Sequence, residues 1–269
     1  MKFIKKKSLG QNFLKNKGIL GKIVSAGKIA PGETVLEIGP GEGYLTSELL
    51  ETGAKVIAIE KDNRLIPILE QKFASEIANG KLILIHDDIL DFSPFSYQLL
   101  TTNYKLIANI PYYITGEILR KALSEWPQPS TIVLLVQKEV ARRIVASPHS
   151  AQGSAGQGKE SLLSISVKIY GQPKIIDIVK AGSFNPAPKV DSAIIAIENI
   201  SKNNLSKISE GRFFEILKAG FAHKRKIISA NLKPVFGEKT LEKLKSCSIE
   251  KDARAENLTL DKWICLSNR

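Results

Sequence analysis

Val-Leu-Glu-Ile-Gly-Pro-Gly-Glu-Gly at residues 35–43 is the stretch of this sequence that decides the fold. Its first four residues predict a buried strand, its glycines predict a tight turn, and residues 44–51 predict a helix. Gly39, Gly41 and Gly43 let the backbone approach a ligand closely, and the following helix begins with free N–H groups. A tight strand-to-helix connection needs glycine in any case, so the turn alone is a weak sign of a ligand site.

Strand-sized apolar segments alternate with helical ones after this turn. The run Ile-Val-Leu-Leu-Val at 132–136 is apolar throughout, as expected of a strand buried on both faces of a parallel sheet. Segments 174–180 and 192–197 have no helix between them and are expected to form an antiparallel pair at one edge. The sequence therefore predicts an α/β, Rossmann-like domain with a mostly parallel seven-stranded sheet. The other expected strands are 34–39, 55–60, 81–88, 104–110 and 130–137, and the expected helices are 44–51, 63–78 and 115–124.

The end of the chain has a different pattern. Strand-like runs stop near residue 201, and Phe213, Leu217 and Phe221 then recur at helical spacing. We therefore expect two domains, residues 1–199 and a small α-helical domain at 200–269. The Gly- and Ser-rich sequence at 147–159 within the first domain is expected to form a mobile loop.

The charges are concentrated at the two ends of the chain. The 269 residues carry 39 Lys and Arg against 27 Asp and Glu, a net charge of +12. Residues 1–30 contain eight Lys and no acidic residue, and residues 200–269 contain 15 basic against 8 acidic residues. This distribution suits a body flanked by surfaces for a polyanion, although a solvated basic tail fits the charge equally well. Nucleic acid is favoured over a membrane, because no amphipathic basic helix opens the chain.

The cysteines and the apolar runs limit the class of protein. Cys247 and Cys265 have no cluster of further Cys or His around them, so we expect neither a disulfide framework nor a zinc site. The longest apolar runs are strand-sized, and none resembles a membrane span or an export signal. We therefore expect a cytoplasmic protein without a metal ion. A monomer is our separate expectation, because the sequence does not reveal the oligomeric state.

Three carboxylates indicate an adenosine-containing cofactor. Glu60 ends the second expected strand, 21 residues after Gly39, where an acidic side chain can accept hydrogen bonds from both ribose hydroxyls. The spacing G-x-G-x-G differs from the dinucleotide fingerprint, and Glu37 in the strand before the turn suits the ammonium of a methionine moiety. Asp88 ends the third strand, near the expected adenine amine. These features favour S-adenosylmethionine over NAD, while Asp87 and Asp88 also fit a second role as caps of the next turn.

Asn109-Ile110-Pro111-Tyr112, at the end of the fourth expected strand, carries the chemistry. The lone pair of an exocyclic base amine is delocalised into the ring, so the amine is a poor nucleophile. An Asn oxygen and a neighbouring carbonyl can accept its two hydrogens, and a Tyr ring can stack on an extruded base. No strong general base is needed, because the N–H becomes acidic once nitrogen attacks a methyl sulfonium. The alternative is a strand-ending turn.

Five segments carry a further pattern: Ser8–Leu14, Glu37–Gly41, Asn109–Tyr112, Val136–Val140 and Phe184–Ser192. Together they resemble the bacterial small-subunit ribosomal RNA adenine N6,N6-dimethyltransferase family. The resemblance implies a class I methyltransferase domain with S-adenosyl-L-methionine as cofactor. It also implies dimethylation of two adjacent adenosines in the 3′-terminal hairpin of the small-subunit RNA during ribosome assembly, with this RNA or a pre-30S particle as partner. The sequence departs from the family in its Gly- and Ser-rich loop, which is longer than the family's usual loop. The resemblance therefore does not imply whether this loop contacts RNA.

The resemblance also implies roles for individual residues. Asn109 and Tyr112 would hold the target amine, and Phe184 would face the base, unless it is a core residue beneath a Pro-rich turn. The cofactor site would comprise Asn12, Leu14, Glu37, Gly39, Gly41, Glu60, Asp88 and Asn109. Residues 221–226 resemble the family's C-terminal domain. On charge, we expect RNA phosphate contacts from Lys5, Lys6, Lys7, Lys224, Arg225 and Lys226, with a solvated face as the alternative.

Three other functions share parts of this pattern. A large-subunit RNA adenine methyltransferase of the macrolide-resistance type has the same reaction centre, but the sequence at 184–192 favours the small-subunit enzyme. A non-catalytic nucleic-acid-binding relative is disfavoured by the intact Asn109–Tyr112 segment with Gly39 and Glu60. A DNA adenine methyltransferase is disfavoured because residues 200–269 are few for a domain that reads a DNA sequence.

Overall fold

The computed structural model describes residues 12–97, 103–148 and 158–268, in two compact units. The sheet unit comprises Met1–Ala141 with Lys174–Ile200, and the helical unit comprises Arg142–Pro173 with Ser201–Arg269. The sequence predicts one boundary at 199/200, whereas residues 142–173 group here with the C-terminal residues. Contacts of Tyr170 connect this segment to the C-terminal residues. Its hydroxyl donates to Glu210 Oε1 at 2.6 Å, and its ring stacks on Phe214. The division into 1–199 and 200–269 stays a prediction.

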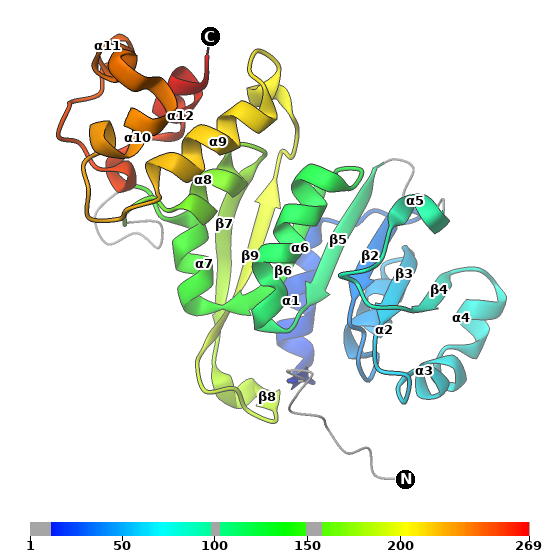
Figure 1. Cartoon of the computed structure of the whole chain (residues 1–269). Coiled ribbons are helices and arrows are strands. Elements are labelled where there is room, and N and C mark those ends of the chain that lie inside the picture. The colour runs from blue at the N-terminus through cyan, green and yellow to red at the C-terminus, as the bar shows by residue number, and fades with distance from the viewer. Residues whose placement is uncertain (1–11, 98–102, 149–157, 269) are drawn as a thin grey trace. The chain divides into compact units, whose positions relative to one another are not determined.

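A seven-stranded sheet forms the sheet unit, with strand order β4-β3-β2-β5-β6-β9-β7 (Figure 1). The first five strands in this order run parallel, and β9 runs antiparallel to β6. The prediction of a mostly parallel seven-stranded sheet is confirmed, although β9 lies between β6 and β7. The strands are β2 (Thr34–Ile38), β3 (Lys55–Glu60), β4 (Leu82–His86), β5 (Tyr104–Asn109), β6 (Thr131–Gln137), β7 (Gln172–Val179) and β9 (Ser192–Glu198).

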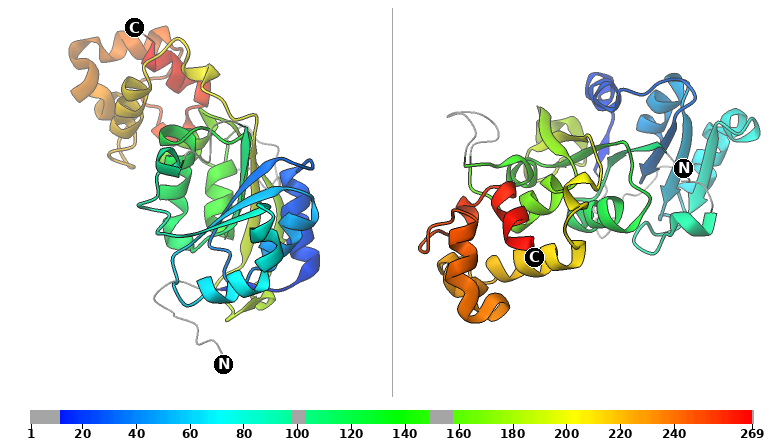
Figure 2. Two further views of the ribbon diagram at one scale, coloured as in Figure 1. Left: turned by 90° about the vertical axis from the view of Figure 1, so that its right-hand side faces the viewer. Right: turned by 90° about the horizontal axis from the view of Figure 1, so that it is seen from above.

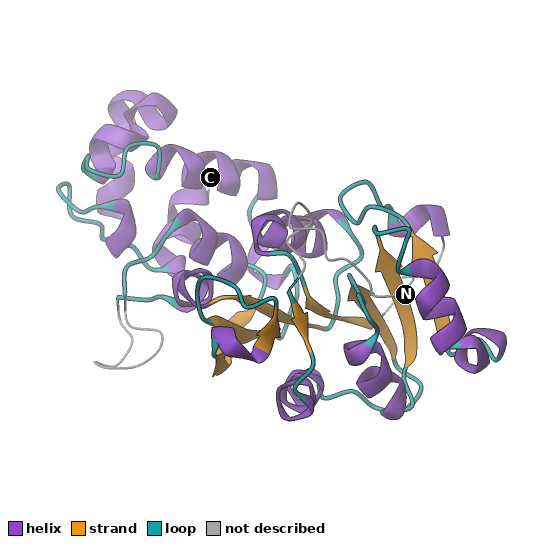
Figure 3. Ribbon diagram, turned by 90° about the horizontal axis from the view of Figure 1, so that it is seen from below, coloured by secondary structure: helices purple, strands orange, loops and turns teal. Residues whose placement is uncertain are grey.

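Helices cover both faces of this sheet (Figure 3). Helix α1 (Lys17–Gly27), which the sequence did not predict, lies along one face and packs on α2 (Tyr44–Glu51) and on β5 and β6 (Figure 2). It begins at Asn16, whose side chain accepts a hydrogen bond from the Ile19 amide at 3.2 Å. The remaining helices of this unit include α5 (Pro94–Tyr97), and α7 (Lys138–Val145) begins in it.

Two predicted helices differ in detail from the observed ones. The expected helix 63–78 is divided into α3 (Ile66–Lys72) and α4 (Ala74–Ala78) at Phe73, whose backbone is not helical. The Phe73 ring packs against Gly43, where a Cβ would come within 2.5 Å of it. Helix α6 (Thr115–Arg120) continues as a π-helical segment, η3 (Lys121–Glu125).

A second, two-stranded sheet joins segments far apart in the chain. β1 (Phe13–Leu14) pairs antiparallel with β8 (Phe184–Asn185), with Leu14 opposite Phe184. Both of these side chains are buried and belong to the same core cluster as Leu20 of α1. The sequence did not predict this pairing, which fixes the N-terminal segment on the sheet unit.

The regular secondary structure described in the second unit is almost entirely helical. Phe213, Leu217 and Trp263 are fully buried in it, which agrees with the helical spacing of the aromatic residues. Gly220 lies against Trp263, whose ring leaves no room for a Cβ. The helices are α8 (Leu162–Lys168), α9 (Glu210–Gly220), α10 (Ile228–Phe236), α11 (Thr240–Ser246) and α12 (Leu260–Ser267). Shorter 3-10 turns, η4 to η7, are Ala181–Ser183 in the sheet unit and Asn203–Leu205, Gly237–Lys239 and Ala255–Asn257 in the helical unit.

Cys247 and Cys265 form a disulfide between the end of α11 and α12, with Cα atoms 5.7 Å apart. The sequence predicts no disulfide framework, and this single disulfide was not expected from it. These residues are 18 apart in sequence, and Lys262 of α12 also donates a hydrogen bond to the Cys247 carbonyl at 2.8 Å. Spacing alone does not reveal this contact. Across the described residues, no helix has both the length and the apolar character needed to cross a membrane.

Candidate functional site

The carboxyl ends of β2, β3, β4 and β5 meet around a pocket of about 170 Å³ in the sheet unit. Ligands bind at this edge of open α/β sheets because the loops after adjacent strands diverge there. A smaller pocket of about 30 Å³ adjoins it, and the two share Phe13, Gly39 and Asn109. Every residue predicted for the cofactor lines one or both: Asn12, Gly41, Glu60 and Asp88 the first, Leu14 and Glu37 the second, and Gly39 and Asn109 both.

The glycine-rich turn leaves open space where a ligand backbone contact is expected. Gly39 has a positive φ of 67°, and nothing lies within 4 Å of the position that a Cβ would occupy. Gly41 also has a positive φ, but a Cβ there would meet the Phe13 ring at 2.7 Å. Gly41 is thus required for packing, whereas Gly39 presents bare backbone to the pocket.

Glu60 is buried at the end of β3, with only 6% of its surface exposed. Its two carboxylate oxygens accept hydrogen bonds from the amides of Gly41, at 3.1 Å, and Asp62, at 2.8 Å. Burial raises the pKa of Glu60, and these two amides oppose that rise. Each oxygen keeps a second lone pair, so the carboxylate can accept hydroxyl hydrogens while it also holds the glycine-rich turn.

Asp88 caps the next turn and also lines the pocket, while its contact with an adenine amine stays a prediction. It lines the pocket, and its Oδ1 accepts from the Leu90 amide at 3.0 Å, which is the expected turn cap. Its Oδ2 pairs with Lys61, which lines the same pocket. Burial alone would raise the pKa of Asp88. The hydrogen bonds from Lys61 and the Leu90 amide outweigh this effect, so the pKa lies below its ordinary value. Asp88 is therefore an ionised acceptor at the pocket wall.

Glu37 lies beneath the turn in the smaller pocket and is 1% exposed. Thr46 of α2 donates a hydrogen bond to its Oε2 at 2.7 Å. Burial raises the pKa of Glu37 to about 8, and the Thr46 hydrogen bond opposes this. A cation that entered this pocket would favour the ionised carboxylate, because opposite charges stabilise each other.

Glu37→Gln should make the protein progressively more stable than the parent as the pH rises. The pKa of Glu37 is about 8 in the folded protein and ordinarily 4.5, so the folded protein keeps a proton that the unfolded chain loses. This contribution is complete below pH 4.5 and is lost as the pH rises through 8. The variant is neutral throughout and should gain about 1.4 kcal/mol per pH unit in this window. Urea denaturation of both proteins at several pH values measures the difference, and a constant difference would contradict a buried neutral Glu37.

Asn109 ends β5 and lies where the two pockets meet. Its amide nitrogen donates to the backbone carbonyl of Asn12 at 3.2 Å. Because the two ends of an amide point in different directions, this bond leaves the Asn109 oxygen as the end that can accept a hydrogen. The N-terminal segment therefore orients Asn109 as an acceptor.

Tyr112 begins a short 3-10 turn, η2 (Tyr112–Ile114), that follows Pro111. Its hydroxyl lies 2.6 Å from the hydroxyl of Ser192, the first residue of β9. Thr115 donates a hydrogen bond to the Tyr112 carbonyl at 3.0 Å. Burial raises the pKa of Tyr112, so its hydroxyl is neutral. The contacts of the hydroxyl and of the backbone carbonyl fix Tyr112 in the wall of the larger pocket.

Phe184 is placed differently from the other predicted catalytic residues. Its side chain is 5% exposed and belongs to the same buried core cluster as Leu14 and Val179. It does not line either pocket described above. The structure thus has Phe184 in the alternative role of a core residue, and a contact between this ring and a base stays a prediction.

Sequence reasoning missed one residue that supports the glycine-rich turn and several that line the larger pocket. Lys72 of α3 reaches back to the turn, where its Nζ donates to the carbonyls of Glu42 at 3.0 Å and Gly43 at 2.9 Å. Tyr113, which is 68% exposed, lines the larger pocket, as do Phe13 and Lys61. Tyr113 and Lys61 directly follow Tyr112 and Glu60, so adjacency to the motifs was the available signal. Lys72 had none, because it lies about 30 residues from its partners.

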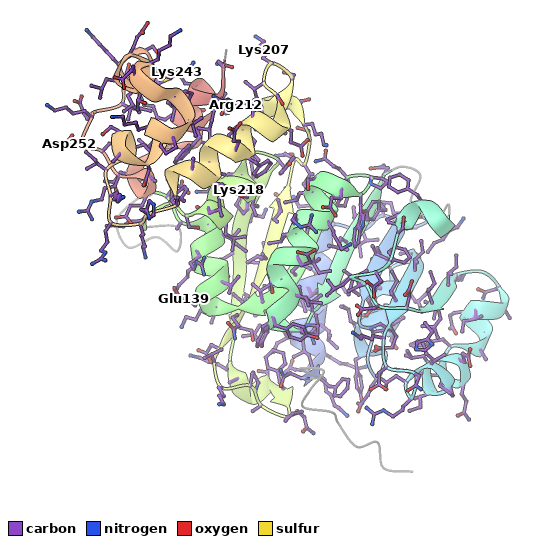
Figure 4. All side chains as sticks on the ribbon, in the orientation of Figure 1. Glu139, Lys207, Arg212, Lys218, Lys243 and Asp252 are labelled. Carbon is purple, nitrogen blue, oxygen red and sulfur yellow. A yellow bond between two sulfur atoms is a disulfide. The ribbon has the colours of Figure 1, made fainter. Side chains whose placement is uncertain are left out.

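Lys224, Arg225 and Lys226 are exposed in the helical unit, between α9 and α10. Among the described residues, none of the three forms a salt bridge, whereas Lys159, Lys168, Lys202 and Arg212 of the same unit all do. Figure 4 shows nitrogen-tipped side chains that project outward around this unit. Lys5, Lys6 and Lys7 lie outside the described residues. No group of His, Cys, Asp and Glu suited to a metal ion occurs within 12–97, 103–148 and 158–268.

The chain is similar to known RNA methyltransferases over nearly its whole length. A family model described as ribosomal RNA adenine dimethylase matches residues 2–269. The chain is 39% identical to the ribosomal RNA small subunit methyltransferase A of Dehalococcoides mccartyi, over 97% of this chain and 87% of the relative. A dimethyladenosine transferase from Plasmodium falciparum superposes with a TM-score of 0.76 at 30% identity, covering 94% of this chain and 95% of its own. The 23S rRNA methyltransferase ErmE superposes with a TM-score of 0.72 at 25% identity, covering 95% and 98%.

Proposed function

Because this chain belongs to the ribosomal RNA adenine dimethylase family and is therefore a methyltransferase, we propose which adenosines it methylates. It transfers methyl groups from S-adenosylmethionine to N6 of two adjacent adenosines in the 3′-terminal hairpin of small-subunit ribosomal RNA. The observation that carries this proposal is the position of Asn109, an oriented acceptor where the larger pocket meets the smaller one. The partner is the small-subunit RNA within a pre-30S particle, in the cytoplasm, and the protein acts as a monomer.

The residues at the pocket fit S-adenosylmethionine. Glu60 accepts the ribose hydroxyls, Asp88 accepts the adenine amine, and the bare backbone of Gly39 allows close approach. Glu37 in the adjoining pocket offers a carboxylate for the ammonium of the methionine portion. When bound, the cofactor supplies an electrophilic methyl group on a sulfonium.

The chain's own residues position the amine that accepts the methyl group. The Asn109 oxygen and the carbonyl of Ile110, which Pro111 holds in place, accept the two amine hydrogens and turn the nitrogen lone pair outward. Tyr112, fixed by Ser192, supplies the face on which the extruded base stacks. The Asn109 oxygen also stabilises the N–H as positive charge develops on nitrogen.

Small-subunit RNA is favoured over large-subunit RNA as the substrate. The curated relatives named for the small subunit match at 39% identity in one case and 37% in another. The 23S rRNA methyltransferase matches at 25%, below the 30% of the dimethyladenosine transferase. A non-catalytic role is disfavoured because Asn109, Tyr112, Gly39 and Glu60 are all present at one pocket.

Labelled S-adenosylmethionine tests this function directly. The protein is incubated with undermethylated small subunits, with large subunits and with DNA, and the nucleosides are separated. Label in N6-dimethyladenosine from the small-subunit RNA is the expected result. Label in large-subunit RNA or in DNA instead would show that the proposed substrate is wrong. If no nucleic acid is labelled, a non-catalytic nucleic-acid-binding function becomes the better explanation.

Neutralising Lys224, Arg225 and Lys226 together should weaken RNA binding and flatten its salt dependence. Removal of each phosphate contact should reduce the slope of log K against log salt by roughly 0.7 to 0.9. Cofactor affinity should stay the same, because these residues lie in the helical unit and the pocket lies in the sheet unit. Titration of small subunits at several salt concentrations measures the slope. If the parent and the triple variant have equal affinities and equal slopes, the three cations do not contact RNA and only face solvent.

A further inference from the structure

The three cations lie in an exposed turn, residues 222–227, which we call the basic turn. Such a run of Lys and Arg on a flexible loop would lose conformational freedom when it binds an anion, and this loss would oppose binding. A turn that is already fixed avoids part of that cost. The contacts around the basic turn show that it is fixed at both ends.

One buried side chain holds the start of the basic turn. Asn231 of α10 is 5% exposed, and its amide nitrogen donates to the carbonyls of Gly220 at 2.6 Å and His223 at 3.1 Å. These carbonyls belong to the last residue of α9 and to a residue of the turn itself. One amide group therefore spans the point where the chain leaves α9 and enters the basic turn.

Backbone contacts hold the rest of the turn. Lys226 donates its amide to the His223 carbonyl at 3.0 Å, and Ile228 donates its amide to the Ala253 carbonyl at 2.7 Å. At the other end, Gly220 lies against Trp263, and the rings of Phe221 and Trp263 stack with centroids 5.4 Å apart. The basic turn thus has a defined path between α9 and α10.

Helix formation and core packing do not explain why position 231 is Asn. Asn is a weaker helix former than Leu or Ala, and a buried amide must recover its lost hydration through hydrogen bonds. Within the part of the chain that the structure describes, the buried Oδ1 of Asn231 has no hydrogen-bond partner. The nitrogen, with its two carbonyl partners, is the end of the amide that the fold uses.

From this geometry we infer that Asn231 is a positioning residue for RNA binding, which presents Lys224, Arg225 and Lys226 to phosphates in one fixed arrangement. The inference rests on the proposed function, in which these cations contact the RNA. Asn231 itself touches no RNA and acts only through the basic turn. Its loss should therefore change RNA binding and leave the cofactor pocket unaffected.

The experiment measures log K for undermethylated small subunits against log salt in five proteins. They are the parent, Asn231→Ala, Asn231→Asp, the triple neutralised variant, and the triple variant with Asn231→Ala added. Asn231→Asp keeps the shape of the side chain but removes the N–H donors. Thr240→Val is the matched control, because Thr240 is equally buried in the same unit and its hydroxyl donates to the Gly237 carbonyl at 2.6 Å.

Both Asn231 variants should weaken binding roughly five- to eightfold at 0.1 M salt for each phosphate that the basic turn no longer reaches, with a flatter slope. Thr240→Val should keep the parent slope, and Asn231→Ala should add nothing to the triple variant, since both changes act through the same cations. Cofactor affinity should stay unchanged throughout. If Asn231→Ala does not fold, Asn231→Asp and trypsin cleavage rates after Lys224 and Arg225 still report on the turn.

The outcomes separate the inference from the proposed function. If the triple variant flattens the slope and both Asn231 variants do not, only the positioning role is overturned. An equal weakening in Thr240→Val, or a further full weakening when Asn231→Ala is added to the triple variant, also overturns it. If the triple variant binds as the parent does, the RNA contact of the basic turn fails together with this inference, while the methylation assay still decides the reaction.

Discussion

Asn109→Ala should lower the single-turnover methylation rate on saturating RNA by about 10²- to 10³-fold, as expected when an oriented polar group that stabilises developing charge is removed. The Asn109 oxygen is the acceptor that its hydrogen bond to the Asn12 carbonyl leaves available. Without it, the amine lone pair stays delocalised into the ring. The rate is measured by rapid quench with enzyme in excess over undermethylated small subunits.

Binding measurements on the same variant separate chemistry from affinity. RNA affinity should change little, because its main contacts are expected to come from charged residues outside the pocket. Asn109→Asp keeps an acceptor oxygen but loses the donor to Asn12, so it should retain more of the rate than Asn109→Ala does. An unchanged rate in Asn109→Ala, or equal rates in the two variants, would contradict the role of the amide oxygen.

Much of the sheet unit could be predicted because its signals are local. The strands β2, β3, β5 and β6 appear as apolar runs, and their ends carry the glycine-rich turn, Glu60 and the Asn109–Tyr112 segment. In a parallel sheet these ends meet at one edge, so a correct assignment of strands brings the site residues together. The cofactor pocket therefore followed from the order of the motifs.

The features that could not be predicted depend on contacts between distant segments. Tyr112 meets Ser192 across 80 residues of sequence, and Lys72 reaches the glycine-rich turn across about 30. The burial of Phe184 follows from the pairing of β8 with β1, for which two-residue strands leave no periodic signal. The same reason applies to Asn231, whose role depends on carbonyls at the end of another helix.

Glu60→Ala should weaken S-adenosylmethionine binding by about two to four orders of magnitude. Two charge-assisted hydrogen bonds to the ribose are each worth about 1.5–3 kcal/mol, and each 1.4 kcal/mol is a tenfold change in affinity. The substitution also frees the amides of Gly41 and Asp62, which the carboxylate holds at 3.1 and 2.8 Å. Calorimetric titration measures the affinity, and Glu51→Ala at the exposed end of α2 is the control for removal of a carboxylate.

A cofactor analogue without the 2′-hydroxyl separates ribose binding from support of the turn. If Glu60 accepts that hydroxyl, the analogue should bind the parent more weakly than S-adenosylmethionine, whereas Glu60→Ala should bind the two with nearly equal affinity. If Glu60 acts only through Gly41 and Asp62, the analogue should lose the same factor in both proteins. If the parent and a folded Glu60→Ala bind S-adenosylmethionine with equal affinity, Glu60 neither binds the ribose nor supports the turn for binding. Either role would make the carboxylate contribute to the binding free energy.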